Sequence, residues 1–213
     1  MKSPDNTTFT DAASTWDSRY NSNEYIFGKE PNRWLHQHNS ALPDSGRVLC
    51  VADGEGRNSV WLASLGLEVD AFDVSKTGVE KARRLASEKN VSVNYAISDC
   101  DGFAWEEDTY DAVVAIFIQF ADPAMRERLF NNIIKCLKPE GVVLLQGYTP
   151  KQLDYRTGGP PEVSHLYTSE LLRNAFAQLR ISELTEYEEV MQEGSRHHGL
   201  SALIGMVAHK DSP

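Results

Sequence analysis

The chain has 213 residues, 41% of them hydrophobic, and a formal net charge of −10 at pH 7. This length fits a single domain with a sizeable core. The acidic balance argues against a nucleic-acid partner and against an anionic membrane surface, because both carry negative charge themselves.

No apolar run approaches the roughly 18 residues that a membrane-spanning helix needs. The polar start, MKSPDNTTFTDAAS, has no hydrophobic signal-peptide core. Cys50, Cys100 and Cys136 lie far apart and show neither metal-binding nor redox spacing. We therefore expect a cytoplasmic protein with reduced cysteines and no bound metal, and either a monomer or a homodimer.

The N-terminal part of the chain differs in character from the rest. Residues 1–15 look loosely ordered, and the aromatic, polar stretch 16–41 is more typical of short helices or a lid than of a strand. We interpret residues 1–41 as an N-terminal lid segment and residues 42–213 as the main domain of a single-domain protein. The lid lacks a long apolar face, so we expect it to be mobile when empty and to close over a ligand.

From Arg47 onward, strand-like and helix-like segments alternate. The run YDAVVAIFIQF is apolar on both faces, which is typical of a central parallel strand. Such alternation predicts a parallel sheet with helices on both faces. Strands are predicted at 47–52, 68–73, 92–97, 111–118 and 141–147. Helices are predicted at 57–65, at 76–89, where EKARRLASEK indicates a solvated face, and at 123–137, ending at LKPEG.

The end of the chain breaks this alternation. A predicted helix at 168–179 is followed by two strand-like runs, RISELTEYEEVMQEG and LSALIGMVAHK, which a short turn joins into an antiparallel pair. The predicted fold class is therefore α/β: a Rossmann-like, doubly wound, mostly parallel seven-stranded sheet with an antiparallel last strand and helices on both faces.

The segment VLCVADGEGRNSVWLASLG combines a strand, a glycine turn and a helix. Gly54 and Gly56 allow positive φ and close approach of a ligand to the backbone, and the helix start offers free N–H groups. Ligands of open α/β sheets bind beyond the carboxyl ends of the strands. By itself this turn is equally consistent with a purely structural role.

Two further acids follow at successive strand ends. Asp73 can accept hydrogen bonds from ribose hydroxyls, although it or Ser75 can instead cap the next helix. Asp99 can accept from an exocyclic amine, and the Cys100 N–H can donate to a ring nitrogen. Together these features predict a nucleoside pocket. Its candidate residues are Asp53, Gly54, Glu55, Gly56, Asn58, Asp73, Val74, Asp99, Cys100 and Ile116.

The type of nucleoside follows from charge. Ser59 stands where a dinucleotide motif has its third glycine, and the acidic pair Asp53 and Glu55 repels a pyrophosphate. A cofactor with an ammonium and a sulfonium suits these acids, which favours S-adenosylmethionine. An NAD-dependent oxidoreductase and a non-catalytic nucleoside-binding protein stay open as alternatives.

Taken together, the motifs resemble those of class I S-adenosylmethionine-dependent methyltransferases, and within them the tellurite-resistance and thiopurine methyltransferase-like proteins. The resemblance runs from about Trp16 to Lys210, through WDSRY, GKEPNRWL, DGEGRNSVWLASLG, AFDVS, LKPEG, GYTPKQL, TGGPP and EGSRHHG. It implies S-adenosylmethionine as cofactor, S-adenosylhomocysteine as product and a small-molecule methyl acceptor, with a thiol or chalcogen oxyanion favoured. Many class I enzymes have an acid where this chain has Cys50, and Asp53 is the nearest replacement.

We expect three places to form the acceptor site. They are the lid, with Trp16, Tyr20, Tyr25 and Phe27; the loop after the fifth strand, with Tyr148, Tyr155 and Arg156; and the last turn, with Glu193, Arg196, His197 and His198. His197 matches the histidine of the family's EGxxHxG pattern. It is the candidate base or acceptor contact, or else a histidine that only hydrogen-bonds the turn.

Overall fold

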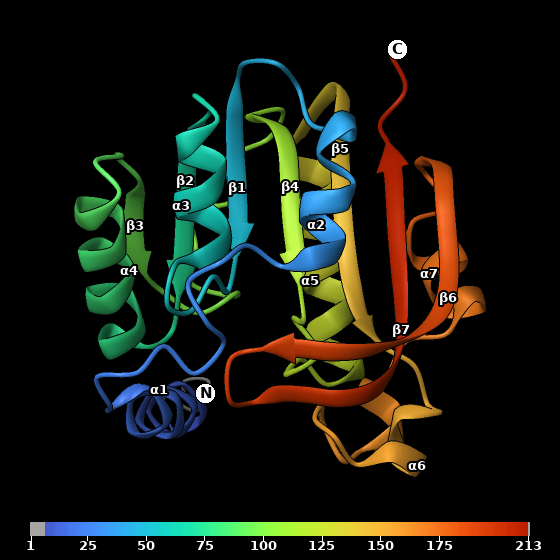
Figure 1. Cartoon of the computed structure of the whole chain (residues 1–213). Helices are drawn as coiled ribbons and strands as arrows, with labels where there is room; N and C mark the ends of the chain where they lie inside the picture. Colours follow the sequence, from blue (N-terminus) through green and yellow to red (C-terminus); the bar gives the residue numbers. More distant parts are fainter. Residues whose placement is uncertain (1–6, 213) are drawn as a thin grey trace, which may run out of the picture.

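The computed structural model describes residues 7–212, which form one seven-stranded sheet in the order β3-β2-β1-β4-β5-β7-β6 (Figure 1). β1 to β5 are parallel, and β7 is antiparallel to both β5 and β6. The predicted fold is therefore confirmed, including its antiparallel last strand. The strands are β1 (Arg47–Val51), β2 (Glu68–Asp73), β3 (Asn94–Ile97), β4 (Tyr110–Ile116), β5 (Leu137–Tyr148), β6 (Arg180–Glu193) and β7 (His197–His209).

Helices cover both faces of the sheet (Figure 1). On one face lie α2 (Arg33–Gln37), α3 (Arg57–Ser64) and α4 (Lys76–Glu88), and on the other α5 (Pro123–Cys136) and α7 (Ser169–Ala175). α1 (Thr7–Tyr20) and α6 (Gln152–Tyr155) lie beyond the carboxyl ends of the parallel strands. Two short 3₁₀ helices, η1 (Asn39–Ala41) and η2 (Val163–His165), complete the elements.

The core consists of two hydrophobic layers because the central strands bury both faces. In β1, Leu49 and Val51 pack into the layer under α5 and α7, whereas Val48 and Cys50 pack into the layer under α2, α3 and α4. This explains why the central strands read as continuous apolar runs. All three cysteines are buried and free. Within residues 7–212, no helix is long and apolar enough to cross a membrane, and no cluster of side chains suits a metal ion.

Some sequence predictions of local structure were wrong. Residues 7–15 belong to α1 rather than to a loose chain, while residues 1–6 lie outside the described part. α1 is held by contact with α4, where Asp17 accepts a hydrogen bond of 2.9 Å from Thr77 N. α7 ends at Ala175, earlier than predicted, and β5 begins at Leu137, directly after α5 ends at Cys136, rather than at residue 141.

The β6–β7 hairpin positions the site. β5 pairs with β7 only as far as Tyr148 opposite Leu203, whereas the hairpin continues to the pair Glu193–His197. Its outer part bends across the carboxyl ends of the sheet (Figure 1). β6 runs parallel to β5, so the turn lies at the same rim as the ends of β1 and β2, as the sequence predicts.

Gly205 of β7 offers a test of this packing. Trp34 of α2 lies directly on it, so that a Cβ at position 205 would lie 2.3 Å from Trp34 Nε1. We expect Gly205→Ala to lower the free energy of unfolding by about 1–3 kcal/mol through overpacking, as measured by urea denaturation. The loss should shrink in a Trp34→Leu background. An equal loss in both backgrounds would contradict this account.

Candidate cofactor and acceptor site

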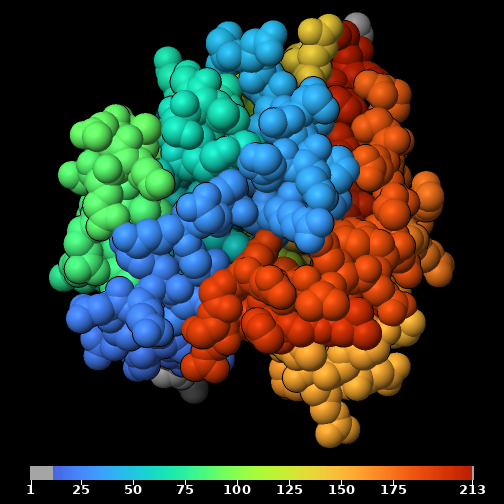
Figure 2. All heavy atoms as spheres, in the orientation of Figure 1, coloured from blue at the N-terminus to red at the C-terminus, as the bar shows by residue number. Residues whose placement is uncertain are grey.

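Two segments cover the carboxyl ends of the strands: the lid, defined here as residues 16–33, and the hairpin tip, residues 189–198. In Figure 2 the lid (blue) and the hairpin (orange to red) meet on one face of the molecule. Ile26 O accepts hydrogen bonds from Ser195 N at 2.9 Å and from Arg196 N at 3.2 Å. The lid also buries Tyr20 and Ile26, at 4% and 7% exposure. These anchors were not evident from its aromatic, polar sequence.

The two glycines of the first turn have different neighbours. Gly54 has φ +62°, and a Cβ there would lie 2.7 Å from the Tyr20 hydroxyl oxygen of the lid. Gly56 has φ +91°, and its Cβ would lie 2.6 Å from Ala82 Cβ in α4. Gly56 is therefore required for packing against α4, which the sequence did not reveal. Only Gly54 borders the lid.

Asp73 organises the turn at the end of β2. Its Oδ2 accepts a hydrogen bond of 2.9 Å from Gly54 N, and its Oδ1 accepts one of 2.8 Å from Ser75 N. Ser75, not Asp73, is the side-chain cap of α4, accepting from Gly78 N at 3.0 Å. Asp73 thus holds two neighbouring strand ends together, and its carboxylate keeps acceptor capacity for a further donor.

Asp53 lies near Asp73, and within residues 7–212 no basic side chain forms an ion pair with it. It accepts hydrogen bonds from the backbone N–H and the hydroxyl of Ser59. Burial raises the pKa of Asp53 to about 6, against the opposing effect of these bonds, and the nearby Asp73 carboxylate adds to the rise. Burial likewise raises the pKa of Asp73 to about 6. The site therefore concentrates negative charge that a cationic ligand would relieve.

The remaining predicted cofactor residues fall into two groups. Val74 and Asp99 are half-buried, Cys100 and Ile116 are buried, and all four lie at the ends of β2, β3 and β4. Asp99 Oδ1 accepts a hydrogen bond of 2.6 Å from Gly102 N and so closes its own turn. Glu55 and Asn58 instead face the lid. Glu55 pairs with Lys81, and Asn58 Oδ1 accepts from Asn32 N at 2.9 Å.

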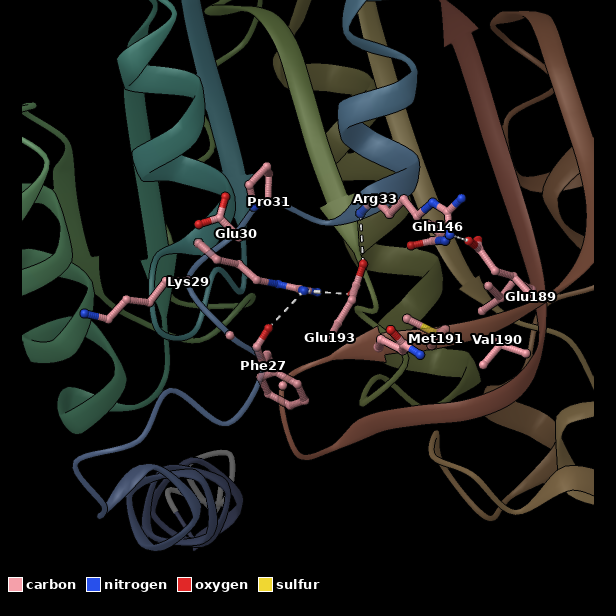
Figure 3. A pocket seen from close by; sticks show the side chains of 15 residues that line it. Phe27, Lys29, Glu30, Pro31, Arg33, Gln146, Glu189, Val190, Met191 and Glu193 are labelled. Atoms are coloured by element: carbon pink, nitrogen blue, oxygen red, sulfur yellow. Dashed lines mark hydrogen bonds and ion pairs between the residues drawn. The ribbon is translucent and has the colours of Figure 1, made fainter.

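The ionised carboxylate of Glu193 joins the lid, α3 and the hairpin (Figure 3). Its oxygens accept from Asn32 Nδ2 at 3.1 Å, from Arg33 N at 2.9 Å and from Arg57 Nη1 at 2.7 Å. Burial alone would raise the pKa of Glu193, but His197, Arg57 and the Arg33 N–H hold it down at about 2. Asn32 and Arg57 lie within the motifs quoted above, but sequence reasoning gave them no role.

A cavity of about 370 Å³ lies between residues 27–33 of the lid and the hairpin tip (Figure 3). Its walls include Phe27, Arg57, Met191 and Glu193, but neither Asp73 nor Asp99. The cavity therefore does not coincide with the predicted nucleoside pocket, and His197 is likewise absent from its walls.

Aromatic rings surround His197 at the start of β7. The ring centroid of His197 lies 4.6 Å from that of Phe27, 4.5 Å from Phe117 and 5.9 Å from Tyr148. Within the described residues, His197 Nδ1 is buried without a hydrogen-bond partner, and it lies 3.8 Å from Glu193 Oε2. Burial lowers the pKa of His197, although Glu193 opposes this, so the imidazole is neutral at pH 7. The structure thus brings together one residue from each of the three predicted acceptor segments.

The other predicted acceptor residues lie elsewhere. Tyr155 donates to Glu188 on the outer strand, and Arg156, Arg196 and His198 are exposed. Tyr25 lies over Lys81, and Trp16 stacks on Tyr20 at a centroid distance of 5.4 Å. Phe117 was missed because its backbone turns to φ +56° just after β4, which a strand pattern does not predict.

Comparison with known sequences supports the class suggested by the motifs. Residues 48–141 match a family model described as a methyltransferase domain. Relatives include a ubiquinone biosynthesis O-methyltransferase of Rickettsia akari, 28% identical over 70% of this chain and 60% of its own length. A probable thiol methyltransferase 2 of Arabidopsis thaliana is 32% identical over 58% of this chain and 54% of its own. A tRNA N(3)-methylcytidine methyltransferase, Mettl2 of Drosophila melanogaster, is 25% identical over 82% of this chain and 63% of its own length.

Solved structures share the fold at low sequence identity. A protein of echinomycin biosynthesis, where a disulfide bond becomes a thioacetal group, has a TM-score of 0.78 at 16% identity, covering 93% of this chain and 91% of its own. TehB of Haemophilus influenzae has a TM-score of 0.68 at 16% identity, covering 94% of this chain and 67% of its own. The N-methyltransferase NodS of Bradyrhizobium japonicum, solved with S-adenosylhomocysteine, has a TM-score of 0.70 at 12% identity, over 94% and 99%.

The methyltransferase domain matched over residues 48–141, the fold and these relatives support the resemblance to class I S-adenosylmethionine-dependent methyltransferases read from the motifs. The chain spans 60%, 54% and 63% of the lengths of the three relatives named above.

Glu193→Gln tests whether this carboxylate holds the closed arrangement. It leaves the buried Arg57 unpaired, so we expect the free energy of unfolding to fall by roughly 3 kcal/mol or more in urea denaturation. Glu189→Gln is the matched control, because its partner Arg33 is mostly exposed, and it should cost less than about 1 kcal/mol.

The pH dependence gives a second check on the same side chain. The pKa of Glu193 is about 2 in the folded protein, below the unfolded value of 4.5. Its contribution to the free energy of unfolding is therefore fully present above pH 4.5 and is lost as the pH falls toward the folded pKa. Equal costs for the two variants at pH 7 would contradict the central role of Glu193.

Proposed function

We propose that this protein transfers a methyl group from S-adenosylmethionine to a soft nucleophilic atom of a small molecule. The acceptor is a thiol or a chalcogen oxyanion. One observation carries the proposal: at the rim of the sheet, the paired acids Asp53 and Asp73 lie at the ends of β1 and β2, and the aromatic cluster around His197 lies beyond the ends of β4 and β5. The acids suit a cationic cofactor. The aromatic cluster offers nonpolar surroundings from which water is excluded during the displacement.

The donor set fits S-adenosylmethionine. Asp73 would accept from the ribose hydroxyls, and Asp53 would face the ammonium of the methionine part. Asp99 and the Cys100 N–H would bind the adenine edge between Val74 and Ile116. The raised pKa values of Asp53 and Asp73 support this fit, because a positive charge beside them would restore their ionisation. The bound cofactor supplies a methyl group on a sulfonium.

Methyl transfer is an in-line displacement, so the protein's task is alignment and exclusion of water. The bond between the methyl carbon and the sulfonium sulfur breaks as the bond to the acceptor forms, and S-adenosylhomocysteine leaves. A thiol acceptor loses its proton to a base, for which neutral, buried His197 is our candidate. The ionised Glu193, 3.8 Å from Nδ1, would stabilise the imidazolium that results.

The acceptor class is supported by the surroundings of His197. Sulfur makes favourable contacts with aromatic ring edges, and Phe27, Phe117 and Tyr148 supply such rings. The name of the Arabidopsis thaliana relative points to thiols. The name of the Drosophila melanogaster relative points to tRNA, but a net charge of −10 argues against a polyanionic acceptor here.

A binding and turnover assay tests this proposal. S-adenosylhomocysteine should raise the thermal midpoint of unfolding, and NAD should not, because only the former lacks a pyrophosphate facing Asp53. Labelled S-adenosylmethionine should then transfer its methyl group to at least one of a panel of aliphatic and aromatic thiols, selenols and selenite. Stabilisation by NAD alone would favour an oxidoreductase. Binding of S-adenosylhomocysteine with no transfer to any acceptor on the panel would contradict the thiol and chalcogen assignment.

Cofactor affinity should depend on pH in a defined direction. Asp53 and Asp73 have pKa values of about 6 without cofactor, and binding the cationic cofactor favours their ionised forms. Below these values binding must release protons, so affinity for S-adenosylmethionine should rise from pH 5 to pH 7 and then level off. Titration calorimetry in buffers of different ionisation enthalpy measures the protons released. Affinity independent of pH across this range would exclude these carboxylates from the site.

A further inference from the structure

Lys81 in the middle of α4 is a buried ammonium with an unusual set of partners. Its side chain is 1% exposed and forms an ion pair with Glu55 of the glycine turn. It also donates to two lid carbonyls, Glu24 O at 2.6 Å and Tyr20 O at 3.3 Å. The ammonium thus faces one carboxylate oxygen and two carbonyl oxygens. The sequence interpretation of this helix segment as a solvated face was wrong for Lys81, since the lid covers it.

Both members of the ion pair bind the lid. The Oε2 atom of Glu55 accepts from Phe27 N at 3.4 Å, and Phe27 is the lid residue whose ring packs on His197. Tyr25 donates its hydroxyl to Lys81 O at 2.9 Å, and Lys81 Nζ lies 4.9 Å from the centre of the Tyr25 ring. The pair thus holds the stretch from Tyr20 to Phe27, whereas Asp53 and Asp73 face the turn from the cofactor side.

The far side of the same stretch is held by the hairpin tip. Ile26 O accepts from two backbone N–H groups of the tip, and a Cβ at Gly194 would lie 2.3 Å from that oxygen. The lid therefore spans two attachment points, one on α4 and the glycine turn and one on the hairpin. Phe27, one residue after Ile26, is positioned by both.

We propose that Lys81 is a positioning residue for methyl transfer: its ammonium fixes the lid carbonyls of Tyr20 and Glu24, so that Phe27 closes the acceptor pocket against His197. This inference rests on the proposed function. It differs from a role in core stability alone, because a buried ion pair contributes little net stability compared with neutral side chains of similar shape. The specific function of the ammonium is to donate to lid carbonyls, which an apolar side chain such as methionine does not do.

The test compares three variants with the wild-type protein. Lys81→Met removes the ammonium at similar length. Lys81→Met/Glu55→Gln also removes the charge left behind on Glu55. Lys76→Met is the control, since Lys76 lies on the same helix with a side chain that is 71% exposed. The measurements are amide hydrogen exchange of the cofactor-free protein, thermal unfolding, and kcat and KM for an accepted thiol.

In Lys81→Met, amide exchange of residues 20–28 should quicken at least tenfold, while that of β4 stays unchanged. The value of kcat should fall at least tenfold, with a smaller change in KM for the acceptor. The double variant should regain thermal stability, because no buried carboxylate is left unpaired, yet its lid exchange and kcat should stay impaired. Lys76→Met should match wild type throughout.

Two results would overturn the proposal: wild-type lid exchange in Lys81→Met, or recovery of lid exchange and kcat together with stability in the double variant. If Lys81→Met does not fold, the double variant alone decides between these outcomes. A wild-type protein that transfers no methyl group would refute the proposed function and the catalytic part of this inference. Hydrogen exchange of the cofactor-free lid still decides whether Lys81 holds it.

Discussion

The closed site depends on the contacts of one largely buried carboxylate, that of Glu193, whose side chain is 11% exposed. It connects the hairpin to the lid through Asn32 and Arg33, and to α3 through Arg57. A charge removed from water is tolerated only with such complete pairing. Because the hairpin extends past the end of β5, this side chain, together with the backbone hydrogen bonds from the tip to Ile26 O, fixes how the hairpin tip lies over the sheet. The position of His197, four residues later, follows from it.

The two halves of the site differ in their chemistry, and the difference suits methyl transfer. At the ends of β1 and β2, two acids form no ion pair with any basic side chain in the described part of the chain, and burial raises the pKa of both Asp53 and Asp73. Beyond the ends of β4 and β5, aromatic rings enclose a neutral histidine. A cationic donor would be held by the first half and would react in the second, where little water competes with the acceptor.

The sequence was sufficient for the sheet but not for the contacts across the site. Alternating apolar runs and the acids at strand ends predict the order of elements and the places of Asp73 and Asp99, because these features are local. Glu55, by contrast, reads as a cofactor contact, and its actual partner Lys81 lies on the face of α4 that reads as solvated. Likewise Asn58 binds Asn32, and Gly56 is required by Ala82. Each of these neighbours is reached by a long-range contact with the lid or with α4, which no local pattern encodes.

A crystal structure of the protein with S-adenosylhomocysteine tests the central claim most directly. The account predicts that Asp73 accepts hydrogen bonds from the ribose hydroxyls and that the sulfur faces the space between Phe27, Phe117 and His197. It also predicts that the Arg57–Glu193 pair is kept. Binding of the ligand away from Asp73, or a sulfur directed away from the aromatic cluster, would contradict the account.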